Sequence, residues 1–223
     1  MRTILNLLCA AALCAFAVNA LASTTEPKEG VEYLTLPVAQ NTDAGKKIEV
    51  TEFFAYYCPH CNAFEPLLSA WVKKQGDSIV FKRVHVPRDA NVAPQQRLFY
   101  TLEAMGLVEQ YHDKVFAAMH VDHLRLNRDE QVFDWAEKAG IDRTKFIDIY
   151  RSFGVQAKLR RADAMMEAYR IDQWPMIAID GRFLTSPSHV GEGMPANATE
   201  PQLQQGALQV MDYLVAKSKA EKK

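Results

Sequence analysis

The most constraining feature of this sequence is a pair of cysteines, Cys58 and Cys61, placed where a predicted strand meets a predicted helix. The strand signal covers residues 47–55, which are mostly β-branched and then aromatic. The helix signal begins at Pro59, whose missing N–H costs nothing in a first helical turn. The two sulfurs are therefore expected at a strand–helix junction of an α/β protein.

The first residues, 1–22, have the pattern of a secretory signal peptide. Arg2 supplies the positive start, residues 4–18 are mostly apolar, and residues 20–22 read Ala-Leu-Ala, a small-x-small cleavage site. The apolar stretch is short for a membrane span, which needs about 20 residues. We expect a cleaved signal and an exported protein. An uncleaved N-terminal anchor is the alternative.

Export changes the meaning of the cysteine count. Of the four cysteines, Cys9 and Cys14 leave with the signal, so that Cys58 and Cys61 remain. Disulfides form in exported compartments, but a loop this short adds little stability. A structural zinc site commonly needs a second cysteine pair or a histidine pair, and the sequence places neither beside this motif. We therefore expect a redox-active pair that uses no metal or other cofactor.

The position of this pair at a helix start predicts different roles for the two sulfurs. Free N–H groups and a partial positive charge at a helix N-terminus stabilise a thiolate, so the pKa of Cys58 is expected to fall. Cys61, one turn later, is expected to lie behind it. His60, when protonated, would favour the Cys58 thiolate further and so make the disulfide a stronger oxidant. The alternative for His60 is a solvated turn residue without a role.

The remaining sequence predicts a mixed sheet with helices inserted into it. Hydrophobic spacing indicates strands near 33–37, 78–86, 176–179 and 182–184, and helices from residue 59 and near 93–105, 108–119, 129–139, 144–152, 156–169 and 201–217. Pro66 is expected to kink the first helix. A strand–helix–strand unit favours a right-handed parallel crossover, and the terminal hairpin adds antiparallel strands to the same sheet. Balanced charge, 26 Lys and Arg against 27 Asp and Glu, gives no reason to expect nucleic acid as a partner.

The segment from Glu52 to Pro66, with Cys-Pro-His-Cys at residues 58–61, resembles the active-site segment of the DsbA family of periplasmic thiol–disulfide oxidants. This resemblance implies a thioredoxin-like α/β fold with an inserted all-helical domain. The thioredoxin-like domain would be discontinuous, over 33–88 and 171–218, and the helical domain would cover 89–170. The resemblance also implies activity as a periplasmic protein disulfide oxidase.

The same resemblance assigns further site residues. Pro175 would form a cis peptide bond beside the disulfide, and the backbone at Trp174 and Pro175 would pair with an extended substrate chain. Tyr57 would also contact substrate. Glu52 would exchange a proton with Cys61, offset by Arg83 or Lys82 on the next strand; a solvated carboxylate is the alternative.

Three functions remain open. In the first, a reduced exported protein attacks Cys58, a second substrate thiol resolves the mixed disulfide, and a quinone-linked membrane partner of the DsbB type restores the disulfide. In the second, the protein is an isomerase or reductase, although the known isomerases of this compartment dimerise through an extra N-terminal domain. In the third, it is a chaperone-like binding module. We expect a monomer.

Overall fold

The computed structural model describes residues 26–222, so the predicted signal peptide at 1–22 lies outside the described residues. Its strands are β1 (Leu34–Thr35), β2 (Ile48–Phe54), β3 (Ile79–His85), β4 (Met176–Ile179) and β5 (Phe183–Thr185). Its α-helices are α1 (Pro59–Gln75), α2 (Ala93–Ala104), α3 (Val108–His120), α4 (Asp129–Lys138), α5 (Arg143–Tyr150), α6 (Phe153–Tyr169), α7 (Pro187–Glu192) and α8 (Glu200–Glu221). In the described part of the chain, no helix is both long and apolar enough to cross a membrane.

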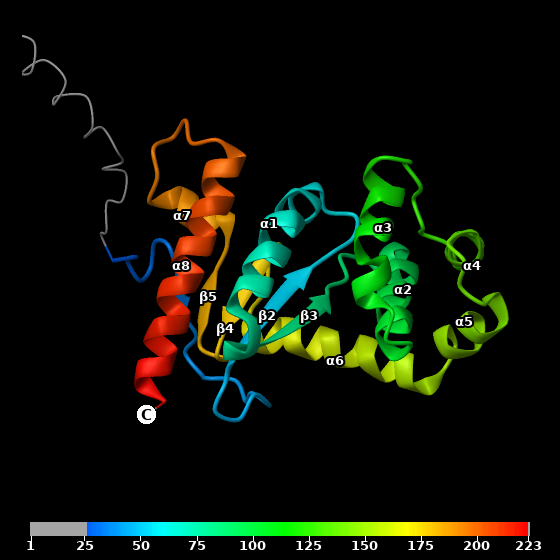
Figure 1. Cartoon of the computed structure of the whole chain (residues 1–223), viewed down its shortest axis with the longest axis horizontal. Helices are drawn as coiled ribbons and strands as arrows, with labels where there is room; N and C mark the ends of the chain where they lie inside the picture. The colour runs from blue at the N-terminus through cyan, green and yellow to red at the C-terminus, as the bar shows by residue number, and fades with distance from the viewer. Residues whose placement is uncertain (1–25, 223) are drawn as a thin grey trace, which may run out of the picture.

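The strands form one mixed sheet in the order β1-β5-β4-β2-β3. β2 and β3 are parallel and are joined by α1, whereas β4 pairs antiparallel with both β2 and β5. The helices α2 to α6 lie between β3 and β4 in the chain and gather at one end of the molecule, with α6 running below the sheet (Figure 1). This is the thioredoxin-like arrangement with an inserted helical region that the sequence predicted.

The side chains of β2 belong to two cores, which follow one another along the strand. Ile48 and Val50 pack with residues of α1 and α8 in the first core. Phe53 and Phe54 belong to the second core, which extends through the inserted helices; the Phe53 ring lies 5.2 Å from the ring of Tyr169 on α6. All seven residues of β2 are buried. This central strand therefore holds the cysteine motif that follows it in a fixed position.

Most of the predicted elements are confirmed, and two details differ. α7 lies between the predicted strand at 182–184 and the predicted helix at 201–217, where no helix was expected, and it begins at an N-cap where Ser186 accepts a hydrogen bond from the backbone N–H of His189. α8 extends beyond the predicted 201–217 at both ends, because a capping box at Thr199 starts it early. α1 runs through Pro66 to Gln75 as one helix, and the kink expected at this proline stays a prediction.

Candidate redox site

Cys58 occupies the N-cap of α1, directly after the buried end of β2. Its backbone is extended, and its sulfur accepts a hydrogen bond from the backbone N–H of Cys61 at 3.3 Å. Pro59 takes the first helical position, where no N–H is needed. Both cysteines are free thiols, and only Cys58 retains any exposure, 5% against 0% for Cys61. The sulfur of Cys58 is therefore the one that another thiol can reach.

The surroundings separate the acidities of the two thiols. A hydrogen bond from the Cys61 thiol, against an opposing effect of burial, lowers the pKa of Cys58 to about 7, and the backbone N–H groups of Cys61 and His60 contribute. Burial raises the pKa of Cys61 well above its ordinary value, and its contact with Cys58 adds to this effect. Cys58 thus ionises near neutral pH while Cys61 stays protonated.

His60 is exposed and is held from a distant part of the chain. Its Nδ1 lies 2.7 Å from Oε1 of Glu200, the first residue of α8, and this contact raises the pKa of His60. The imidazolium in turn helps to lower the pKa of Cys58. The structure thus gives His60 a partner in Glu200, and the role of His60 in favouring the Cys58 thiolate stays a prediction.

Beneath the cysteines lies a buried group of charged side chains. Glu52 and Arg83 are register partners on β2 and β3, and Nε of Arg83 donates to Oε2 of Glu52 at 3.2 Å. Nη2 of the same arginine donates to Glu65 of α1 at 2.6 Å. Burial, and then the charge of Glu65, raises the pKa of Glu52 to about 8, although Arg83 opposes the rise. Glu52 therefore holds a proton at neutral pH. Of the two predicted partners, Arg83 is therefore the one that offsets the charge of Glu52. Lys82 pairs with Glu49 at 2.7 Å instead.

The buried group continues into the inserted helices. Nε2 of His112 on α3 lies 3.3 Å from Oε2 of Glu65, and its Nδ1 lies 3.0 Å from the hydroxyl of Tyr56. Burial opposes ionisation of Glu65, but its contacts with His112 and Arg83 lower its pKa below the ordinary value. Polar contacts therefore join the cysteine helix to the inserted region on the side of the motif opposite to α8.

The segment before β4 approaches the exposed sulfur from the other side. The Trp174–Pro175 peptide bond is cis, as the resemblance implied. The Cys58 thiol donates to the carbonyl oxygen of Trp174 at 3.6 Å, and the ring of Tyr57 meets the Trp174 indole edge-on at 6.1 Å between centroids. Cys58, Tyr57, Trp174 and Pro175 thus form one surface around the sulfur.

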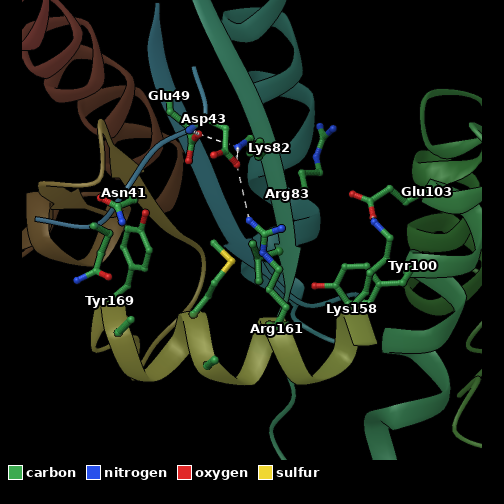
Figure 2. A pocket seen from close by; sticks show the side chains of 16 residues that line it. Asn41, Asp43, Glu49, Lys82, Arg83, Tyr100, Glu103, Lys158, Arg161 and Tyr169 are labelled. Atoms are coloured by element: carbon green, nitrogen blue, oxygen red, sulfur yellow. Dashed lines mark hydrogen bonds and ion pairs between the residues drawn. The ribbon is translucent and has the colours of Figure 1, made fainter. Parts of the chain in front are cut away.

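A separate pocket of about 550 Å³ lies between β2, β3, α2 and α6. Figure 2 shows its charged lining, in which Lys82 contacts Asp43 and Glu49, and Arg161 reaches toward Asp43. Its lining includes neither cysteine nor Pro175, so it is not part of the redox site. Within residues 26–222, no three His, Cys, Asp or Glu side chains form a group that could hold a metal ion.

Sequence reasoning missed two acidic residues at this site. Glu65 is four residues after Cys61 and lies on the same face of the helix. An acidic residue on the buried face, beside Phe64 and Leu68, is unusual and could have identified Glu65 from the sequence. Glu200 is 140 residues from His60, and no local pattern connects them. Its position is a consequence of how α8 packs against α1.

Comparison with known proteins places this geometry in context. Residues 78–193 match the DSBA-like thioredoxin domain, and residues 38–101 match thioredoxin. The chain is 37% identical over 217 residues to the thiol:disulfide interchange protein DsbA of Bordetella parapertussis, a match that covers 97% of this chain and 98% of the relative. It is 36% identical to the DsbA of Burkholderia cepacia, with 88% of each chain covered.

A solved structure has the same architecture. The crystal structure of Pseudomonas aeruginosa DsbA superposes with a TM-score of 0.79 at 29% identity, covering 87% of this chain and 96% of that one. The likeness therefore extends over the sheet and the inserted helices together.

Proposed function

This chain belongs to the DsbA family of thiol–disulfide oxidoreductases, and we propose that it donates a Cys58–Cys61 disulfide to reduced exported proteins in the periplasm. The observation that carries this proposal is the contrast between the two sulfurs at the start of α1. Cys58 is the accessible one and accepts the Cys61 N–H at 3.3 Å, whereas Cys61 is fully buried behind it.

In the first step, a substrate thiolate attacks the sulfur of Cys58. A substrate–Cys58 disulfide forms, the Cys58–Cys61 bond breaks, and Cys61 leaves with the electron pair. Because the pKa of Cys61 is raised well above its ordinary value, this sulfur takes up a proton. Glu52, with a pKa of about 8, is protonated at neutral pH and is the donor; its Oε1 has no hydrogen-bond partner among the described residues.

In the second step, another thiolate of the substrate attacks the substrate sulfur of the mixed disulfide. The substrate gains its disulfide, and Cys58 leaves as a thiolate. A leaving thiol of low pKa leaves faster, and the Cys58 pKa of about 7 suits this role. The same low pKa stabilises the reduced protein relative to its disulfide, so the pair is an oxidant.

Substrate recognition uses the surface around Cys58. An extended chain pairs with the backbone at Trp174 and Pro175 as an added strand, and Tyr57 contacts it on the other side. The carbonyl oxygen of Trp174, 3.6 Å from the Cys58 sulfur, supports this position. Backbone pairing does not depend on the side chains of the substrate, so this contact by itself does not select among substrate sequences.

The remaining assignments rest on the family and the sequence. The N-terminal signal directs export and is cleaved, the mature protein acts as a monomer, and a quinone-linked membrane protein of the DsbB type restores the disulfide. The mature protein needs no cofactor of its own.

The reduction potential of the purified protein tests the function. Equilibration with glutathione, followed by counting of free thiols, should give a value well above that of thioredoxin, about −270 mV. A reduction potential like that of thioredoxin would indicate a reductase or isomerase in place of the oxidase.

The Cys61→Ala variant should in addition trap substrates on Cys58, and Glu52→Gln should slow the first step without changing which sulfur reacts. A binding module would be indicated by two results together. The wild-type protein would show no oxidase activity, and a variant with both cysteines replaced by Ser would still protect unfolded chains from aggregation.

A further inference from the structure

A second pocket, of about 420 Å³, borders the redox site on the side of the inserted helices. Tyr57, the residue before Cys58, belongs to its wall. The other walls come from the chain after β3 and from the end of α3 with the segment that follows it. Nε2 of His120 on α3 lies 2.8 Å from the carbonyl oxygen of Tyr56, which ties this wall to the cysteine segment. We call this hollow the cation-lined pocket.

The charged side chains of the pocket are of one sign. These are the guanidinium groups of Arg88 and Arg125; the imidazoles of His120 and His123 also contribute to the lining, and none of the described residues that line it is acidic. Arg88 lies over the Tyr57 ring, with its Cζ 5.2 Å from the centroid. Its Nε lies 3.3 Å from Asp89, which is outside the lining, and its terminal nitrogens have no ion-pair or hydrogen-bond partner among residues 26–222. Two guanidinium groups are thus available to a ligand.

Two buried polar atoms of the lining lack partners. The hydroxyl of Tyr57 and Oε1 of Gln95 are both buried and unpaired within the described chain, and Gln95 is only 3% exposed. Nε2 of Gln95 donates to the carbonyl oxygen of Arg125 at 2.8 Å, which fixes the direction of its free oxygen. Burial raises the pKa of Tyr57, so its hydroxyl remains a donor. Unpaired buried groups are costly, and a ligand that satisfies them gains affinity.

The lining therefore offers donors for a carboxylate and one acceptor for an N–H. A carboxylate accepts from Arg88, Arg125 and the Tyr57 hydroxyl, and Oε1 of Gln95 accepts from the peptide group of the same ligand. The formal net charge of the whole chain is −1, so its overall field does not attract acidic ligands. An attraction for acidic ligands beside the redox site therefore depends on local charges such as those of Arg88 and Arg125.

We propose that the cation-lined pocket binds an acidic side chain of the substrate polypeptide close to its reactive cysteine, and so determines which substrate cysteines react fastest. This inference rests on the proposed oxidase function. A substrate attached to Cys58 lies next to Tyr57, and an extended chain advances about 3.3 Å per residue. An Asp or Glu within about four residues of the substrate cysteine therefore reaches the pocket.

The test compares matched peptides with two cysteines that carry Glu or Gln at one position, from two to four residues on either side of the first cysteine. Oxidation by the wild-type protein is followed at 50 mM and 500 mM NaCl. Each rate is divided by the rate of the same peptide with neutral 2-hydroxyethyl disulfide, because a nearby carboxylate also changes the reactivity of the peptide thiol. At one or more positions the Glu/Gln ratio should reach about twofold to fivefold at low salt, as for a partly exposed charge pair, and should fall toward one at high salt.

Variants locate the effect. Arg88→Gln and Arg125→Gln should each reduce the Glu/Gln ratio. Arg160→Gln should leave it unchanged, and is a matched control because Arg160 is also exposed and also lies over an aromatic ring, 5.4 Å from that of Phe153. A ratio of one or less at every position, or a ratio that neither pocket variant changes, would overturn the inference.

A binding measurement separates this inference from the function itself. Peptides with Ser in place of Cys are titrated into the protein while the imidazole NMR signals of His120 and His123 are followed. The Glu peptide should shift these signals more than the Gln peptide does, and equal shifts would refute the pocket. If no peptide is oxidised but the Glu peptide still shifts the signals, only the proposed function fails. If peptides are oxidised at equal rates, only the pocket fails.

Discussion

The effect of the Cys61 thiol on the pKa of Cys58 provides the sharpest test of the redox site. The pKa of Cys58 lies at about 7 against an ordinary 9.0, and the Cys61 thiol is the largest single cause. Cys61→Ala removes this donor. Cys61→Ser keeps an O–H donor at the same place, so it is the matched control. Neither variant can form the internal disulfide, so both report on the reduced site alone.

The expected size follows from the groups that remain. After the Cys61→Ala change, the backbone N–H groups of Cys61 and His60 and the charge of His60 still favour the Cys58 thiolate, while burial still opposes it. Loss of the largest favourable contact should raise the Cys58 pKa by about one unit, which is about 1.4 kcal/mol. At pH 7 the thiolate fraction would then fall from about one half to about one tenth. Cys61→Ser should titrate close to pH 7.

Two assays measure this shift. Thiolate absorbance at 240 nm as a function of pH gives the Cys58 pKa directly in variants that hold one cysteine. The rate of alkylation by iodoacetamide should show the same inflection, because only the thiolate reacts. A Cys58 pKa that stays near 7 in both the Ala and the Ser variant would refute the reasoning and would assign the low pKa to the helix N-terminus instead. A higher pKa in both would show that serine does not reproduce the thiol contact.

Two other predictions concern histidines. Burial lowers the pKa of His85 to about 3. Between pH 6.5 and 3, the His85 imidazole is therefore protonated in the unfolded chain but not in the folded one. The free energy of unfolding should fall as the pH falls through this range, by as much as about 5 kcal/mol. Glu52, with its raised pKa, changes stability in the opposite direction between about pH 4.5 and 8. The urea unfolding free energy of His85→Gln should therefore be compared with that of the wild type at each pH. Parallel curves of unfolding free energy against pH for the two proteins would contradict the assignment. Glu200→Gln should lower the pKa of His60 toward 6.5 in an NMR titration, and Glu192→Gln on α7 should not; an unchanged His60 pKa would show that the 2.7 Å contact does not persist in solution.

The local part of the site could be predicted from the sequence. A buried strand followed by Cys-Pro-His-Cys determines that Cys58 caps a helix and that Cys61 lies one turn behind it, because strand alternation, the N1 preference of proline and the helical repeat act over a few residues. The helices of the inserted region followed from hydrophobic spacing in the same way. α7 was missed because six residues are too few to show a periodic pattern, although Ser186 and Pro187 gave a start signal.

The electrostatics of the site were decided by tertiary structure. Glu52 holds a proton because the register of β2 against β3 sets it opposite Arg83, while α1 adds the second acid, Glu65. Burial and Coulomb effects act over a few ångströms of space and not over sequence separation, so a strand shifted by one residue would remove this arrangement.

The sequence by itself determined which chemistry is present, because the identity and spacing of Cys58 and Cys61 require only a local helix start. Tertiary structure alone decided how that chemistry is adjusted and what it meets. The packing of α8 brings Glu200 to His60, and the chain before β4 brings the carbonyl oxygen of Trp174 to the Cys58 sulfur. These contacts join residues 140 and 116 positions apart, and only the folded sheet and its helices bring such residues within hydrogen-bonding distance.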